Sequence, residues 1–181
     1  LTIGTLSAKN TITDVFLGTG LVSVSSMEDE ADIQNFAADD VADHATIQGA
    51  SVLKGTLKFL QLDPDVRIKF FGQDSTTSGL GYASIGVYPK RAVQYASLGS
   101  LQDGRRALLV TVYPNMSLTG KPTKETETDS SDKPTAINWE AKVQATASDF
   151  YTTKNGSKAA EFEYKFVGDD VEKVLDYIKS G

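Results

Sequence analysis

GLVSVSSMEDEADIQNFAADDVADHATIQGASVLKGTLKFLQL, residues 20–62, sets the architecture of this chain. Its first half alternates as a strand with one packed and one solvated face does, because successive strand side chains point to opposite sides. One predicted face carries Val22, Val24, Ser26, Glu28, Glu30, Asp32 and Gln34, and the other carries Leu21, Ser23, Ser25, Met27, Asp29, Ala31 and Ile33. Beyond Met27 the first face is therefore a row of mostly acidic groups, and the second stays partly apolar.

Alternation returns in the second half of this stretch, from Ile47 onward. One side carries Leu53, Leu57 and Phe59, and the other carries Lys54, Thr56 and Lys58. A polar linker at residues 37–46 separates the two alternating segments. Two such segments predict an extended hairpin over residues 20–62.

The acidic residues of the chain concentrate in this hairpin. Between Glu28 and Asp43 there are seven Asp or Glu residues and no Lys or Arg, while the net charge of the whole chain is −6. A protein that binds duplex DNA through its phosphates carries basic surfaces instead. From the residues alone, the acidic stretch indicates a solvated loop or face.

The N-terminal residues 1–18 are expected to form an arm and then a strand near 11–17, with Gly18 and Gly20 turning the chain into the hairpin. Residues 73–89 are rich in Ser, Thr and Gly and indicate a loop.

A short helix is predicted directly after the hairpin. Asp63 can cap its free amides, and Pro64 fits its first turn. Val66 and Phe70 fall on one side and are expected to pack on the sheet, and Gly72 suits the exit.

Further strands are predicted at residues 92–99, 105–113, 137–147 and 161–167. The Asp103-Gly104 pair between the first two favours a tight hairpin turn. Residues 117–135 contain one aliphatic side chain larger than alanine, Leu118, and therefore predict a long exposed loop.

A C-terminal amphipathic helix is predicted over residues 169–180. Its apolar positions Val171, Val174, Leu175 and Ile178 recur at the spacing of one helical face.

Composition limits the class of protein. The 181 residues are most simply one domain, residues 1–181, with room for a substantial core. The chain has no cysteine, which excludes disulfides and zinc–thiolate sites. It contains neither an apolar run long enough to span a membrane nor a basic-then-apolar leader, and because it begins without Met we expect further N-terminal residues.

Candidate catalytic and metal-binding residues form no recognised motif. His44 follows Asp43, but no G-x-S-x-G sequence accompanies them. Asp39, Asp40 and Asp43 lack the alternating spacing of an EF-hand calcium loop. We therefore expect no enzymatic activity, no cofactor and no metal site.

Several segments resemble the major tail protein, or tail tube protein, of long-tailed phages that infect Gram-positive bacteria, in particular the lactococcal type. They are TGLVSVSSMEDE, ADDVADH and GASVLKGTLKFLQ in the hairpin, and VYPNMS, TKETETDS, INWEAKVQATASD and DDVEKVLDYIKSG farther along. The resemblance runs from about Thr19 to the end, whereas residues 1–18 match poorly. It implies a structural virion protein with a mainly β, tail-tube-type sandwich or barrel fold.

The resemblance also implies stacked hexameric rings around a negatively charged channel through which the genome passes at ejection. The residues expected to line that channel are Glu28, Glu30, Asp32 and Gln34. Contacts between subunits or rings are expected from Asp39, Asp40, Asp43, Lys54, Lys58, Arg105, Arg106, Lys121 and Lys124. The implied partners are further copies of the protein and the tape measure, tail terminator and distal tail proteins, with DNA passing without specific binding and no membrane involved. The implied location is the virion tail, and the host cytoplasm during assembly.

Two other functions stay open from the residues. A carbohydrate-binding β-sandwich on a virion or cell surface would need a solvent-facing aromatic platform, whereas Phe162, Tyr164 and Phe166 alternate as core residues do. A hydrolase with paired carboxylates would need an apolar pocket that raises the pKa of one of them.

Overall fold

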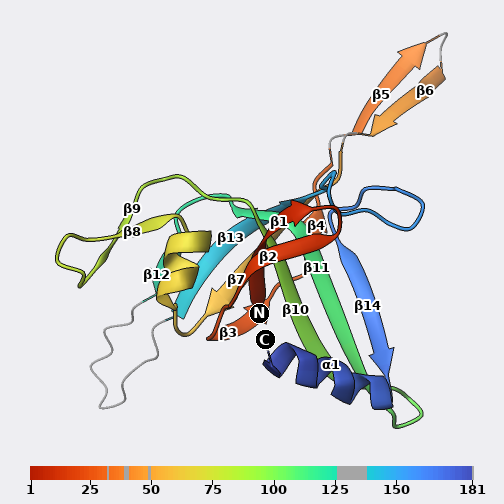
Figure 1. The fold of residues 1–181 in the computed structure, drawn as a ribbon. Coiled ribbons are helices and arrows are strands. Elements are labelled where there is room, and N and C mark those ends of the chain that lie inside the picture. The colour runs from red at the N-terminus through yellow and green to blue at the C-terminus, as the bar shows by residue number, and fades with distance from the viewer. Residues whose placement is uncertain (32, 39–40, 49, 126–137, 181) are drawn as a thin grey trace, which may run out of the picture.

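The computed structural model describes residues 1–31, 33–38, 41–48, 50–125 and 138–180, without side-chain detail at 33–38, 41–48, 125 and 175–180. Over these ranges the chain forms a ten-stranded antiparallel sheet, two separate two-stranded ribbons and two helical segments (Figure 1). The mainly β fold predicted from the sequence is confirmed.

The strands of the main sheet are β1 (Thr2–Ala8), β2 (Thr11–Leu17), β3 (Leu21–Val24), β4 (Glu28–Asp29), β7 (Val52–Phe59), β10 (Arg91–Ser100), β11 (Arg106–Leu118), β12 (Thr123–Glu125), β13 (Asn138–Thr146) and β14 (Phe162–Val167). The ribbons are β5 (Ile33–Ala38) with β6 (Val41–Gln48), and β8 (Gln73–Ser75) with β9 (Tyr82–Ser84). The helical segments are η1 (Val66–Phe70), a single π-helical turn, and α1 (Asp169–Ser180). The main sheet runs in the order β2-β1-β10-β11-β13-β7-β3, with β12 beside β13, β14 beside β11 and β4 beside β7.

Strand β11 connects the two parts of the sheet. Its first half pairs with β14 and its last four residues pair with β13, while β10 runs along its other edge. Strands that are distant in the sheet order nevertheless share one core, because fully buried Ile3 of β1 and Phe59 of β7 lie in the same hydrophobic cluster. The sheet therefore curves around this core, as a sandwich or barrel requires.

The helical turn η1 closes the main core. Val66, Phe70 and Phe71 are fully buried, and the Phe71 ring packs edge-on against Phe59 with centroids 5.8 Å apart. Gly72 follows with a φ of 59°, in the left-handed region that favours glycine, as expected at this exit. The predicted packing of Val66 and Phe70 is confirmed.

The predicted capping role of Asp63 is wrong, because the start of η1 has no side-chain cap. The Asp63 carboxylate instead accepts hydrogen bonds from the Thr19 hydroxyl and from the Thr19 backbone N–H, the latter at 3.2 Å. This contact joins the two ends of the 20–62 hairpin, a partnership across the chain that local helix signals do not reveal.

The long hairpin is confirmed. Near the body β3 and β4 pair with β7, and farther out β5 pairs with β6 in a ribbon that projects from the body (Figure 1). The predicted linker at 37–46 is wrong, because β5 and β6 continue through it until Ala38 pairs with Val41. Polar composition suggested a linker there, but the ladder between the two strands supplies the backbone hydrogen bonds.

The alternation predicted for the first strand of the hairpin is broken by a bulge. Val24 pairs with Leu57, whereas Glu28 pairs with Lys54, so one extra residue lies between them. Ser25 bridges the gap: its backbone N–H donates to the carbonyl of Thr56 at 2.9 Å, and its Oγ accepts the Thr56 N–H at 2.8 Å. The prediction that Val24 shares a face with Glu28 is therefore wrong, since Val24 packs on the main core.

Two other segments are more ordered than predicted. The strand predicted near 11–17 is confirmed as β2, but the residues before it form the strand β1 instead of a loose arm, with Ile3 fully buried. Residues 73–89 include the ribbon β8–β9 within the predicted loop. Both gain their ladder bonds from a partner strand, which Ser, Thr and Gly content does not disclose.

The exposed loop predicted at 117–135 is wrong at its start. Ser117 and Leu118 are the last residues of β11 and are 6% and 3% exposed, and β12 pairs with β13. The stretch 126–137 lies outside the described residues.

The C-terminal helix is confirmed. Val171 is fully buried and forms a second hydrophobic cluster with Leu108, Val110 and Val112 of β11, while Val174 packs at its edge. The side chains of Leu175 and Ile178, predicted for the same face, lie outside the described residues. Tyr164, predicted as core, is 40% exposed, and its hydroxyl lies 2.8 Å from that of Tyr151.

Candidate functional site

The face of β7 and β13 that points away from the main core carries charged side chains. In the register of the two strands Lys58 lies opposite Glu140, Thr56 opposite Lys142 and Lys54 opposite Gln144. The alternate residues, which include Leu57, Phe59, Ala141 and Val143, are buried in the core. With the adjoining carboxylates of the hairpin, this surface comprises Glu28, Glu30, Lys54, Lys58, Glu140 and Lys142, and we call it the charged face.

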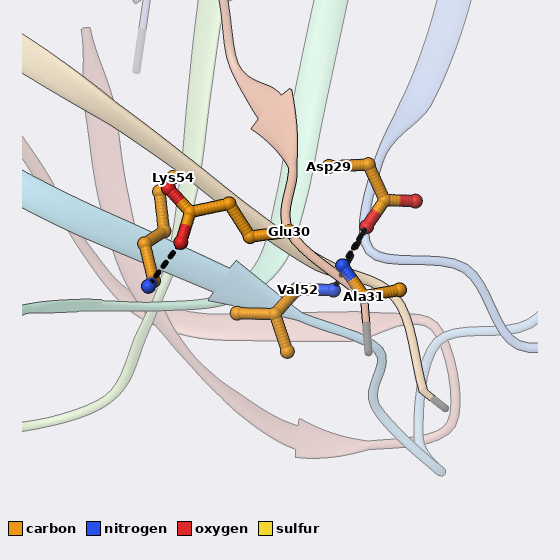
Figure 2. Close-up of polar contacts among 5 residues, drawn as sticks. All are labelled: Asp29, Glu30, Ala31, Val52 and Lys54. Carbon is orange, nitrogen blue, oxygen red and sulfur yellow. Dashed lines mark hydrogen bonds and ion pairs between the residues drawn. The ribbon is translucent and has the colours of Figure 1, made fainter. Parts of the chain in front are cut away.

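Two of the three lysines on the charged face form ion pairs with glutamates. The Lys54 ammonium contacts the Glu30 carboxylate (Figure 2), and Lys58 Nζ lies 3.4 Å from Glu140 Oε2. Glu28 pairs with Lys54 in the strand register. Three lysines therefore stand among three glutamates, so the face is locally balanced and not simply acidic.

An open groove of about 510 Å³ crosses the charged face. Its lining includes Glu28, Glu30, Lys54 and Lys142 together with Ser and Thr side chains. The Glu30 and Lys54 side chains are 52% and 45% exposed, so water screens their attraction strongly. The groove therefore presents a solvated ionic surface. A carboxylate that acts as a general acid needs an apolar environment that raises its pKa, and these exposed side chains do not lie in one.

Asp29 lies on the opposite side of this strand and closes the base of the projecting ribbon. Its Oδ1 accepts the backbone N–H of Ala31 at 3.1 Å and that of Val52 at 3.3 Å (Figure 2), and its Oδ2 accepts the Ser51 hydroxyl at 2.9 Å. The carboxylate thus joins the two strands where the main sheet ends and the ribbon begins.

The structure brings together only part of the predicted channel-lining row. Glu28 and Glu30 lie on the charged face. Asp32 lies outside the described residues, and Gln34 is placed in β5 by its backbone alone. The shared face of Glu28 and Glu30 is as predicted.

The acidic residues predicted at the hairpin end are mostly beyond what the structure describes. Asp39 and Asp40 lie outside the described residues, and Asp43 is placed in β6 by its backbone.

The basic residues predicted for subunit contacts are distributed over the surface. Lys54 and Lys58 have the partners given above. Arg105 pairs with Asp103 at 2.7 Å, and this hydrogen bond holds the pKa of the Asp103 carboxyl below its usual range. Arg106 lies 3.3 Å from Glu172 of α1.

Lys121 and Lys124 line a second pocket with Trp139. Contact of any of these basic residues with another subunit stays a prediction.

Sequence reasoning missed Glu140, Lys142 and the role of Asp29. The first two were available from the segment INWEAKVQA, in which Glu140, Lys142 and Gln144 occupy alternate positions. The contacts of Asp29 carried no such signal, because Val52 becomes its neighbour only through the hairpin register.

Over the described ranges, no group of three or more Asp, Glu, His or Cys side chains is arranged to hold a metal ion. No helix in the part of the chain that the structure describes is long and apolar enough to cross a membrane.

The class that the fold defines is a mainly β protein with a curved antiparallel sheet, a projecting ribbon and the charged face. The sequence model of the family described as phage tail tube protein matches residues 4–179, and the chain belongs to this family. The resemblance noted in the hairpin and C-terminal segments is thereby confirmed.

The chain is 38% identical to the tail tube protein of Lactococcus phage F4-1 over 184 residues, which cover 97% of this chain and 60% of that protein. The tail tube proteins of Lactococcus phages p2 and SK1 are also 38% identical, over 183 residues with the same coverage. The chain thus spans 60% of the length of these curated relatives. No solved structure matches it.

Proposed function

We propose that this chain is the self-assembling part of a phage tail tube, in which six copies form a ring and the rings stack around a channel. Membership of the tail tube protein family supports a structural role in the virion tail. The subunits would fold and assemble in the host cytoplasm, and the tube needs no catalytic residue and no cofactor.

The observation that carries this proposal is the ribbon β5–β6. It extends beyond the main sheet as two strands, and among the described residues no third strand pairs with it. An isolated two-stranded hairpin is marginally stable in water, and its unpaired backbone groups are ready to bind another strand. Neighbouring copies in a ring or stack would supply the missing contacts.

Exposed apolar side chains give a second reason to expect assembly. Leu80, Ile85 and Val87 lie in and beside the ribbon β8–β9 and are 92%, 55% and 66% exposed. Exposed apolar side chains that form a contiguous patch mark interaction sites. We assign this segment to contact with an adjoining copy.

Removing the ribbon tests assembly. A variant in which residues 33–48 are replaced by a two-residue Asn-Gly turn should keep the β content of the main sheet by circular dichroism. It should form no rings or tubes by electron microscopy under conditions in which the unmodified chain forms them. Tubes of normal appearance from the shortened chain would contradict the role of the ribbon.

We further propose that the charged face lines the channel, with Asp32 and Gln34 continuing the row of Glu28 and Glu30. A basic wall would bind DNA by releasing its counterions. On the charged face, however, Lys54 and Lys58 are each held by a glutamate. Pairing keeps these lysines from the phosphates, and any unpaired carboxylate repels DNA within a screening length of about 8 Å.

The test removes the glutamate partners of Lys54 and Lys58 and introduces no new lysine or arginine. Glu30→Gln with Glu140→Gln should let assembled tails form but slow DNA ejection, more strongly at low salt because phosphate contacts are screened by ions. Adding Lys54→Gln and Lys58→Gln should restore the original rate. Ejection that is insensitive to the two glutamines at every salt concentration would contradict this placement of the face.

Other tail components complete the proposal. A tube of this kind would enclose the tape measure protein and meet the tail terminator and distal tail proteins at its ends. Their contact residues are expected on the ring edges that also stack on further copies.

A further inference from the structure

A second pocket lies between η1, the ribbon β8–β9, residues 121–124 and Trp139 of β13. It has a volume of about 580 Å³ and is lined by Arg67, Gln73, Tyr82, Ser84, Lys121, Pro122, Thr123, Lys124 and Trp139. Three of these residues are cationic and none is acidic. The described lining of the pocket is therefore basic, on a chain whose net charge is −6.

Arg67 is held in the pocket by two aromatic rings. Its Cζ lies 4.7 Å from the ring centroid of Tyr82 and 4.7 Å from that of Trp139. Stacking occupies the flat faces of a guanidinium and leaves its N–H groups, which point outward in the plane, to bind oxygen atoms. The Nε–H of Arg67 donates to the Leu62 carbonyl at 3.5 Å, and its two terminal NH2 groups make no hydrogen bond to another described residue. Among the described residues no carboxylate forms an ion pair with Arg67.

Gln73 provides a second, independent sign of an absent ligand. The residue is 7% exposed, and its buried Oε1 has no hydrogen-bond donor within the described part of the chain. Native proteins seldom leave such an atom unpaired. A ligand for this pocket therefore carries both an anionic acceptor for Arg67 and an N–H or O–H donor for Gln73.

We propose that this pocket binds an acidic peptide segment from a second copy of the chain, namely the aspartate-rich end of the long hairpin. A peptide supplies both groups, because its Asp carboxylates can accept from Arg67, Lys121 and Lys124 while its backbone N–H donates to Gln73. The sequence around Asp39, Asp40 and Asp43 contains no basic residue, and it joins β5 to β6, the two strands of the ribbon that projects from the body (Figure 1). This inference rests on the proposed self-assembly.

The same geometry argues against a sugar as the ligand. A carbohydrate platform needs an open aromatic face, but the Arg67 guanidinium stacks on Tyr82 and Trp139 alike. Lys124 Nζ also lies 5.9 Å from the Trp139 ring centroid. The cations therefore take up the surfaces on which a sugar or a nucleobase would stack.

Binding can be measured directly, because Trp139 is the only tryptophan of the chain and lies in the pocket. The probe is a cyclised peptide of residues 36–45, added to the unassembled full chain while tryptophan fluorescence is recorded. The peptide should change the fluorescence saturably, and raising the salt concentration should weaken it. A control peptide with Asn at positions 39, 40 and 43 should bind at least about tenfold more weakly. A tenfold loss is the effect of removing one charged hydrogen bond.

Pocket variants give the matched controls. Arg67→Met, which keeps an unbranched side chain between the two rings, and Lys124→Gln should each weaken the acidic peptide, whereas Lys142→Gln on the charged face should not. A saturable response to an oligosaccharide and none to the acidic peptide would overturn the inference. Equal binding of the acidic and Asn peptides would overturn it as well.

Assembly separates this inference from the proposed function. A chain with Lys121→Glu and Lys124→Glu should assemble poorly, and adding Asp39→Lys and Asp40→Lys should restore assembly. If all of these variants form tubes like the unmodified chain, the pocket assignment is wrong while the proposed function stands. If the unmodified chain never forms rings or tubes, the proposed function fails, and the peptide titration still decides what the pocket binds.

Discussion

Asp29 is expected to control the stability of the projecting ribbon. Its carboxylate accepts three hydrogen bonds, from the backbone N–H groups of Ala31 and Val52 and from the Ser51 hydroxyl. Replacing it by alanine removes all three hydrogen bonds at the point where β4 and β7 give way to β5 and β6. The main core is untouched, because Asp29 is exposed and lies outside both hydrophobic clusters.

The magnitude follows from the exposure of the site. Water can reach the freed donors, so the loss resembles that of an exposed helix N-cap, about 0.5–2 kcal/mol, and not the larger cost of orphaned buried groups. At 1.4 kcal/mol for each tenfold change, opening at the base of the ribbon should become about 2- to 30-fold more frequent.

Amide hydrogen exchange measures this opening. The reporter is the Glu30 N–H, which donates to the Val52 carbonyl at 2.9 Å and does not itself contact the Asp29 side chain. Its exchange should accelerate in Asp29→Ala, while the amide of Val112 in β11 should exchange as before. The control is Glu28→Ala, which removes a neighbouring carboxylate that makes no hydrogen bond to another described side chain. Unchanged Glu30 exchange in Asp29→Ala, or an equal change in both variants, would refute the reasoning.

Three further outcomes can be checked on the same protein. Gly72→Ala should lower the free energy of unfolding, measured in urea, by more than about 3 kcal/mol, because an added Cβ would lie 1.7 Å from the Val87 carbonyl oxygen. Gly79→Ala should lower it by only about 1–2 kcal/mol, because Gly79 has a φ of 70° but no atom within 4 Å of the added Cβ. Equal losses in the two variants would contradict the steric argument. Val171→Ala should lower the free energy of unfolding by about 2 kcal/mol, since this residue of α1 is fully buried against β11. A loss near zero would mean that the helix does not pack as described. Burial raises the pKa of Tyr151 above the ordinary tyrosine value of about 10. The free energy of unfolding should therefore be constant below about pH 10 and fall above it, because the tyrosine of the unfolded chain ionises first. Tyr151→Phe should flatten this decline, and an unchanged slope in that variant would contradict the role of Tyr151.

Much of the architecture could be predicted because its signals are local. The alternation of Leu53, Leu57 and Phe59 and the 3.6-residue spacing that includes Val171 and Val174 each identified an element and its buried side. These patterns depend only on which residues avoid water. They correctly placed the 20–62 hairpin and the C-terminal helix.

The predictions that were wrong concern features that depend on residues far away in the sequence. The bulge at Ser25 is fixed by its bonds to Thr56, 31 residues away, and a single inserted residue exchanges the faces of everything before it. The strand character of Ser117 and Leu118 likewise comes from pairing with β13. Neither contact can be predicted from the residues close by in the sequence.

The candidate site was predicted only in part for the same reason. Glu28 and Glu30 were identified from parity within one short segment, which lies beyond the bulge and so kept its alternation. Contact of Lys54 and Lys58 with other subunits stays a prediction, but the sequence did not show that the register places them beside Glu30 and Glu140 on one face. A charge count along one strand cannot anticipate the charges that a neighbouring strand contributes.

Electron cryo-microscopy of assembled tubes tests most directly the claim that the charged face lines the channel. We expect the density to show rings of six subunits in which Glu30, Lys54 and Lys142 face the lumen, with the core residue Phe59 directed away from it. A reconstruction that placed Lys142 and the Lys54–Glu30 pair on the outer surface of the tube would contradict the account.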